Sequence, residues 1–168
     1  IRDSYRTTFE LLTKLYHHLL NKIDDSKQMI IMGDSAGGQI ALAFAQQLKK
    51  DSEPQPSHIV LISPVLDATF SNPEARKYEK EDPMLGIEGS KYLVNLWAGD
   101  APLDHYKLSP MYGDLEDLGH ITITTGTKET LYPDAVKFST MLNEKGINHE
   151  FIPGYSLFHI YPIFPIPC

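Results

Sequence analysis

Cysteine is almost absent from this sequence of 168 residues. Its one cysteine, Cys168, excludes an internal disulfide bond and a metal cluster built on cysteine ligands. Continuous apolar runs are only a few residues long, well short of the ~18–20 residues that a membrane-spanning helix needs. We therefore expect neither a disulfide-stabilised domain nor an integral membrane segment.

An excess of positive charge is missing as well. Lys and Arg number 15 against 22 Asp and Glu, which gives a formal charge of −7 at pH 7. Neither half of the chain is basic, so we expect no nucleic-acid partner. The hydrophobic share of 42% and the charged share of 22% are typical of a globular protein, and the length suits one domain. The sequence begins with Ile1 rather than Met, and no signal-like segment follows. The cytoplasm is the default expectation for its location. A homo-oligomer is left open.

Helical and strand-like patterns alternate along the chain. Apolar residues recur every three or four positions in segments that predict helices over 4–20, from the glycine-rich segment 33–38 to about 50, and from about 134 to 145, where Gly146 ends the helix. Four short segments, the first of them a continuous apolar run, are predicted strands, at 29–32, 58–62, 121–124 and 148–152. That run is typical of a strand buried on both faces. The alternation predicts an α/β fold, with a doubly wound, mostly parallel sheet and helices on both faces.

Residues 1–168 are predicted to form a single domain. Residues 64–118 are its least regular part, with one helix expected near 90–97, and we interpret 68–107 as a cap-like or pocket-shaping insertion. Three prolines in 161–168 argue against a helix there and favour an extended end.

The segment Gly33–Asp34–Ser35–Ala36–Gly37 matches the pattern G-x-S-x-G. A predicted buried strand precedes it and a predicted helix follows, which is the setting of a nucleophile elbow. At such a corner the serine backbone is strained, and the hydroxyl points out at the carboxyl end of the sheet, where ligands bind. We expect side chains at positions 33 and 37 to collide with the turn, and the Ala36 N–H to donate to an oxyanion. Ser35 is the predicted nucleophile.

Trypsin-like proteases also contain a Gly-Asp-Ser segment. They are all-β proteins in which the histidine and the aspartate precede the serine. Here the serine follows the strand of a predicted βα unit, and most of the chain comes after it. We therefore reject the protease interpretation.

A serine hydroxyl needs a histidine to take its proton, and the chain has seven histidines. Six of them fall on predicted helices or strands, or in or beside the irregular region. His159 alone lies in a loop just after a predicted strand, at the same end of the sheet as Ser35. His159 is therefore the predicted general base.

The acid of a triad should follow a strand that lies between the serine and the histidine in the sequence. After the predicted strand 121–124 come Glu129 and Asp134. Asp134 follows Pro133 at a predicted helix start, where the helix dipole stabilises a carboxylate. We prefer Glu129 and keep Asp134 as the alternative.

At this point the chain resembles the hormone-sensitive-lipase-like esterases, the fold-3 group of the α/β-hydrolases. Five segments carry the resemblance in family order: GDSAGG at 33–38, SPVLD at 63–67, LSPMY at 108–112, GTKETL at 126–131 and LFH at 157–159. In that family the acid lies three residues after a glycine and two before a leucine, which is Glu129 here, where an aspartate is more usual.

The resemblance implies a serine hydrolase that cleaves carboxylic esters, with small or short acyl groups, through an acyl-enzyme intermediate. Ser35, His159 and Glu129 would form its triad, and Ala36 would contribute to its oxyanion hole. It implies a small-molecule ester as substrate and neither a metal nor an organic cofactor. Two alternatives stay open, which are an amidase with the same triad and a catalytically silent binding protein on the same scaffold.

Two parts of the family pattern are missing. The family's H-G-G-G segment and first strands lie upstream of the elbow, and a final helix follows the histidine. We therefore expect the C-terminal catalytic portion of a longer enzyme. We also expect little activity from these 168 residues alone, because one lost oxyanion donor costs about 2.7–4 kcal/mol.

Overall fold

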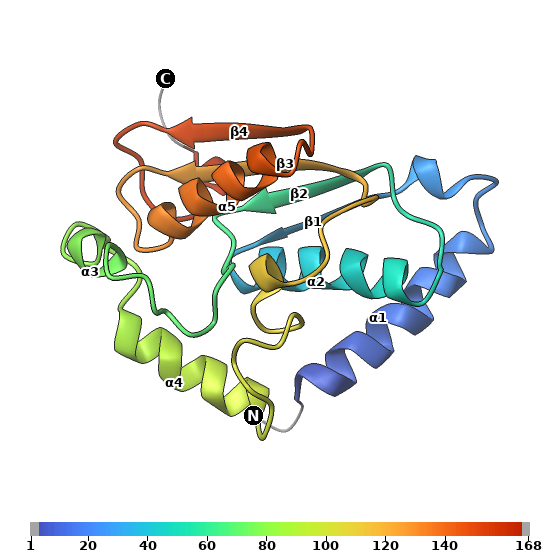
Figure 1. Cartoon of the computed structure of the whole chain (residues 1–168), viewed down its shortest axis with the longest axis horizontal. Coiled ribbons are helices and arrows are strands. Elements are labelled where there is room, and N and C mark those ends of the chain that lie inside the picture. The colour runs from blue at the N-terminus through green and yellow to red at the C-terminus, as the bar shows by residue number, and fades with distance from the viewer. Residues whose placement is uncertain (1–3, 166–168) are drawn as a thin grey trace.

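The computed structural model of the chain describes residues 4–165, and within them four parallel strands form one sheet (Figure 1). The strands lie side by side in the order of the sequence, as β1 (Ile30–Asp34), β2 (His58–Ile62), β3 (His120–Gly126) and β4 (His149–Gly154). Because all four run in the same direction, their carboxyl ends meet at one edge of the sheet. The predicted strands are confirmed, with β3 and β4 longer than expected.

Helices connect the strands. They are α1 (Tyr5–Leu20), α2 (Ala36–Lys50), α3 (Ala75–Tyr78), α4 (Ile87–Ala98) and α5 (Tyr132–Glu144), with short 3-10 turns η1 (Ser26–Gln28), η2 (Pro110–Tyr112) and η3 (Tyr161–Ile163). Gly146, with φ +68°, follows the end of α5 as predicted, because a left-handed residue there is easiest for glycine. The α/β fold class with a parallel sheet is confirmed. Within residues 4–165, no helix is both long and apolar enough to cross a membrane.

One face of the sheet carries the main core. Apolar side chains of α2 and α5 pack there on β2 and β3, and they include Leu42, Ile59, Leu61, Ile121 and Phe138. Both helices therefore lie on the same face, whereas the sequence predicted helices on both. On the other face Ile30, Met32 and Ile152 remain 59%, 62% and 49% exposed.

The prediction that the first strand is buried on both faces is wrong. β1 lies at an edge of the sheet, and its side chains alternate between exposed and half-buried. A continuous apolar run cannot distinguish a central strand from an edge strand with one open face.

The helix α1 packs against the side of α2 that faces away from the sheet. Tyr5, Phe9 and Tyr16 are buried there, and the rings of Tyr16 and Phe44 meet edge to face at 5.6 Å. This is the apolar face that the spacing over 4–20 predicts.

The irregular region 64–118 contains more helix than the sequence indicated. The helix expected near 90–97 is the longer α4, and α3 precedes it, both outside the stack of strands in Figure 1. Near the end of the chain an extended conformation was expected, but the structure has the 3-10 turn η3 there. The turn can form because a proline is tolerated in the first turn of a helix. Residues 166–168 of that predicted end lie outside the described residues. The cap-like role of 68–107 stays a prediction.

Candidate active site

Ser35 forms a sharp corner between β1 and α2. Its backbone has φ 53° and ψ −118°, a combination that a residue with a side chain rarely adopts. Two hydrogen bonds hold the corner in place: the Ser35 N–H donates to the Ile62 carbonyl at 2.8 Å, and its own carbonyl accepts from the Val65 N–H at 3.1 Å. This strained corner at the carboxyl edge of the sheet is the geometry that the motif predicts.

Two glycines allow α2 to turn back so closely. A Cβ on Gly33 would collide with the backbone of Gly37, and a Cβ on Gly38 would come within 2.9 Å of Pro64. The prediction for Gly37 itself is wrong. A Cβ at that position would meet only the Asp34 carboxylate, at 3.9 Å, because it points away from the turn. The close approach therefore requires glycine at 33 and 38.

The Ala36 N–H is the first of α2. Backbone N–H groups in the first turn of a helix have no acceptor one turn earlier, and Ala36 is exposed. The group is therefore available to a ligand beside Ser35.

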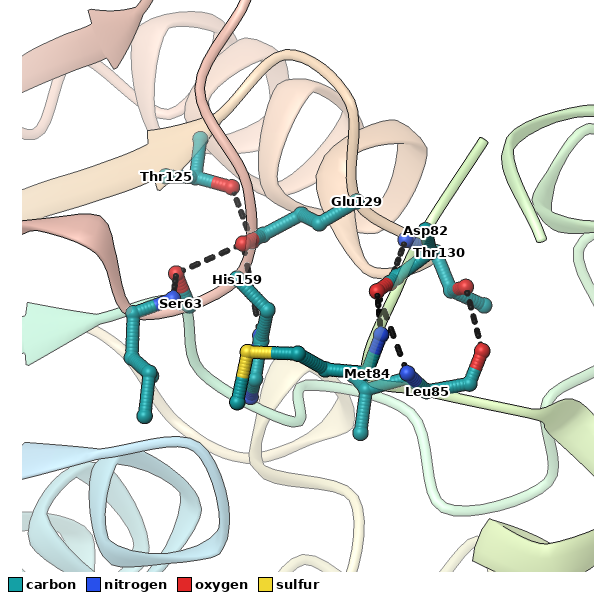
Figure 2. Close-up of polar contacts among 9 residues, drawn as sticks. Ser63, Asp82, Met84, Leu85, Thr125, Glu129, Thr130 and His159 are labelled. Carbon is teal, nitrogen blue, oxygen red and sulfur yellow. Dashed lines mark hydrogen bonds and ion pairs between the residues drawn. The ribbon is translucent and has the colours of Figure 1, made fainter. Parts of the chain in front are cut away.

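Glu129 lies in the loop between β3 and α5 and is fully buried. Its Oε2 accepts from the Ser63 hydroxyl at 2.8 Å, and its Oε1 accepts from the Thr125 hydroxyl. The same Oε2 lies 3.3 Å from His159 Nδ1 (Figure 2). The buried carboxylate is thus satisfied by three side chains from β3 and two separate loops.

His159 lies in the loop after β4 and is only 2% exposed. Its contact with Glu129 is made through Nδ1, which leaves Nε2 for another partner. The Ile160 N–H donates to the Ser63 hydroxyl at 2.9 Å, and Ser63 directly follows the residue whose carbonyl holds the Ser35 N–H. These contacts bring the loops of Ser35 and His159 to one place on the sheet edge. Within residues 4–165 the Ser35 hydroxyl has no hydrogen bond to His159, so their pairing stays a prediction.

The alternative acid, Asp134, is not bonded to His159. It lies in the first turn of α5, as predicted, and its carboxylate accepts from the Asn72 amide at 2.8 Å. Burial raises the pKa of Asp134 above its ordinary value, although the Asn72 hydrogen bond acts in the opposite direction. Of the two carboxylates, Glu129 is therefore the one placed against the histidine.

Four other histidines lie away from Glu129 or bind other side chains. The rings of His58 and His120 meet edge to face at the opposite, amino-terminal edge of the sheet, with centroids 5.5 Å apart. His17 contacts Glu53 on the surface, and His149 contacts Ser139 on α5. None of these four contacts Glu129.

Three side chains at this site were missed by the sequence reasoning. Ser63 and Thr125 bind Glu129, although the segment containing Ser63 was noted only for its resemblance. Asp82 accepts hydrogen bonds from the N–H groups of Met84 at 2.9 Å, Leu85 at 3.1 Å and Thr130 at 2.7 Å (Figure 2). Asp82 thereby ties the segment 82–85 to the residue after Glu129. The signal for Ser63 was its position directly after a strand end, beside the predicted triad.

A second buried carboxylate, Asp67, organises the loop after β2. Burial would raise the pKa of Asp67, but hydrogen bonds from Thr69, Tyr112 and Ser71 outweigh it and hold the pKa below its ordinary value. Desolvation and the neighbouring Asp67 raise the pKa of Tyr112 to about 12. Asp67 therefore joins the two Ser-Pro segments. Within the part of the chain that the structure describes, no three His, Cys, Asp or Glu side chains are arranged to hold a metal ion.

Comparisons with known proteins point to one family. A family model described as "alpha/beta hydrolase fold" matches residues 2–163. An esterase of Acinetobacter venetianus is 31% identical over 149 residues, which cover 88% of this chain and 49% of that protein. An acetyl-hydrolase of Streptomyces hygroscopicus is 30% identical over 159 residues, which cover 89% and 52%.

Solved structures give the same result. The crystal structure of an esterase from the bacterial hormone-sensitive lipase family superposes with a TM-score of 0.90 at 26% identity, over 97% of this chain and 56% of that one. The chain spans about half the length of the curated relatives it matches. With a family model matched over nearly its whole length and a strained serine between β1 and α2, this chain belongs to the α/β-hydrolase-fold family, in the group of the hormone-sensitive-lipase-like esterases.

Proposed function

We propose that this chain carries the catalytic residues of a serine carboxylesterase. The observation that supports the proposal most is the buried pair of Glu129 and His159, presented at the sheet edge where Ser35 forms its corner. The relatives named esterase and acetyl-hydrolase favour a small or short-chain acyl ester as the substrate.

The proposed reaction begins when the Ser35 hydroxyl oxygen attacks the ester carbonyl carbon. His159 Nε2 takes the hydroxyl proton, while Glu129 accepts from Nδ1–H and so holds the ring in the useful tautomer and stabilises the imidazolium. The carbonyl oxygen becomes an oxyanion, to which the Ala36 N–H donates.

The tetrahedral intermediate then collapses. The bond to the alcohol oxygen breaks, His159 Nε2–H gives its proton to that oxygen, and the acyl group stays on Ser35. A water molecule, deprotonated by His159, attacks the acyl carbon and releases the carboxylic acid and the free serine. Each proton taken by His159 is returned within the cycle, so the proposed reaction needs no cofactor.

A fluorophosphonate probe and a chromogenic ester test the proposal in the intact protein that carries this sequence. We expect covalent labelling at Ser35 and hydrolysis of p-nitrophenyl butyrate, both lost in Ser35→Ala. Absence of labelling in the wild-type protein favours a silent binding protein, and faster turnover of an anilide than of the matching ester favours an amidase. The cytoplasmic location and a homo-oligomer remain predictions.

A further inference from the structure

We infer that Ser63 is a positioning residue: its one hydroxyl group fixes the acid of the proposed triad, Glu129, relative to the loop that carries His159. The inference rests on the proposed function, and it assigns a role to a side chain in the segment 63–67. Ser63 is fully buried and directly follows β2.

The backbone of Ser63 is held as firmly as its side chain. Its N–H donates to the Thr124 carbonyl near the end of β3 at 2.7 Å, and its φ of 47° lies in the left-handed region. A serine accepts this conformation only at a cost in strain, which is tolerated where the surrounding structure determines it. The hydroxyl is therefore presented from a fixed point between β2 and β3.

The direction of both hydroxyl hydrogen bonds follows from chemistry. A backbone N–H can only donate, so the Ser63 oxygen accepts from Ile160, at 2.9 Å. An ionised carboxylate can only accept, so the Ser63 proton points to Glu129 Oε2, at 2.8 Å. One hydroxyl thus joins the acid to the residue after His159, across sequence separations of 66 and 97 residues.

This arrangement suits a glutamate as the acid. A glutamate side chain has one more rotatable bond than an aspartate, so its carboxylate needs more contacts to stay in one orientation. Thr125 holds Oε1, while Ser63 and His159 share Oε2. Without the Ser63 hydroxyl, Glu129 can rotate away from Nδ1, and the partly buried Ile160 N–H loses its acceptor. Ser63 acts through these two neighbours.

The test compares Ser63→Gly and Ser63→Ala with Ser139→Ala in the intact protein. Glycine removes the hydroxyl and tolerates the positive φ, so Ser63→Gly keeps the test valid if Ser63→Ala fails to fold. Ser139 is a matched control, because it is also a buried serine whose hydroxyl is hydrogen-bonded. Its partner is His149 Nε2, at 2.7 Å, and this pair lies away from the site. We expect kcat for p-nitrophenyl butyrate to fall about 10- to 100-fold in Ser63→Gly with KM unchanged, and neither to change in Ser139→Ala.

A second readout does not depend on turnover. The proton on His159 Nδ1 should give a downfield proton NMR resonance in the wild-type protein and in Ser139→Ala, and the resonance should shift or broaden in Ser63→Gly. Unchanged kcat and an unchanged resonance in Ser63→Gly would overturn the inference. A wild-type protein that hydrolyses nothing, yet loses the resonance in Ser63→Gly, would refute the proposed function and leave the positioning role supported.

Discussion

His159 Nδ1 lies 3.3 Å from Glu129 Oε2, and both side chains are almost completely buried. The two residues are 30 positions apart in the sequence and come from loops after neighbouring parallel strands. This pairing favours Glu129 over Asp134 as the proposed acid, and it leaves Nε2 of the same ring for the proposed nucleophile.

The first prediction concerns Glu129. Glu129→Gln keeps the shape of the side chain but cannot stabilise a charged imidazolium, so kcat should fall about 10³- to 10⁴-fold. Glu129→Asp should retain more activity than Glu129→Gln, because it keeps the charge while its carboxylate withdraws from Ser63 and His159. Ester hydrolysis by the purified variants checks the order. Wild-type turnover by Glu129→Gln would contradict it.

The second prediction concerns Asp134, the alternative acid. Burial raises its pKa above the ordinary 3.8, so the folded state binds the proton more tightly than the unfolded state does. The ionised group therefore lowers the free energy of unfolding above its folded-state pKa, and this penalty disappears as the pH falls below 3.8.

Asp134→Asn removes the charge and keeps an oxygen for Asn72. We expect a higher Tm than wild type at pH 7, a difference that shrinks on acidification, and unchanged ester hydrolysis. Asp100→Asn serves as the control, because Arg6 lowers the pKa of this exposed carboxyl and the substitution should not raise Tm. Loss of turnover in Asp134→Asn would return Asp134 to the triad.

The third prediction concerns the link between the segment 82–85 and the loop that carries Glu129. Asp82→Ala removes the acceptor of the Thr130 N–H and frees the loop that carries Glu129. We expect kcat to fall about three- to tenfold, because only one of the three hydrogen bonds of Asp82, the one from Thr130, reaches the acid loop. Asp114→Ala is the control. It removes a comparable turn contact, with the Glu116 N–H, and an ion pair with Lys49, both far from the site, so it should leave kcat unchanged. Equal effects of the two substitutions would refute a specific role for Asp82.

Local patterns in the sequence predicted most of the scaffold. The strand and helix positions follow from apolar periodicity, and the corner at Ser35 follows from a motif with a strand before it and a helix after it. The position of the candidate site at one edge of the sheet follows from the parallel strands alone, because their carboxyl ends lie at the same edge.

The remaining features depend on contacts that no local pattern contains. The exposure of Ile30 and Met32 depends on what lies beside β1, and an apolar run carries no information about that neighbour. The roles of Ser63 and Asp82 depend on hydrogen bonds to residues 66 and 48 positions away. Position 37 has room for a side chain because a Cβ there would point away from the turn, and the motif does not specify that direction.

The most direct test of the central claim is the rate at which a fluorophosphonate labels Ser35 in the intact protein, compared with Ser35→Ala and His159→Ala. We predict one covalent adduct on Ser35 in the wild-type protein, no adduct in Ser35→Ala and much slower labelling in His159→Ala. Turnover of p-nitrophenyl butyrate should fall in parallel by about six orders of magnitude in Ser35→Ala. Hydrolysis by Ser35→Ala at the wild-type rate would contradict the account.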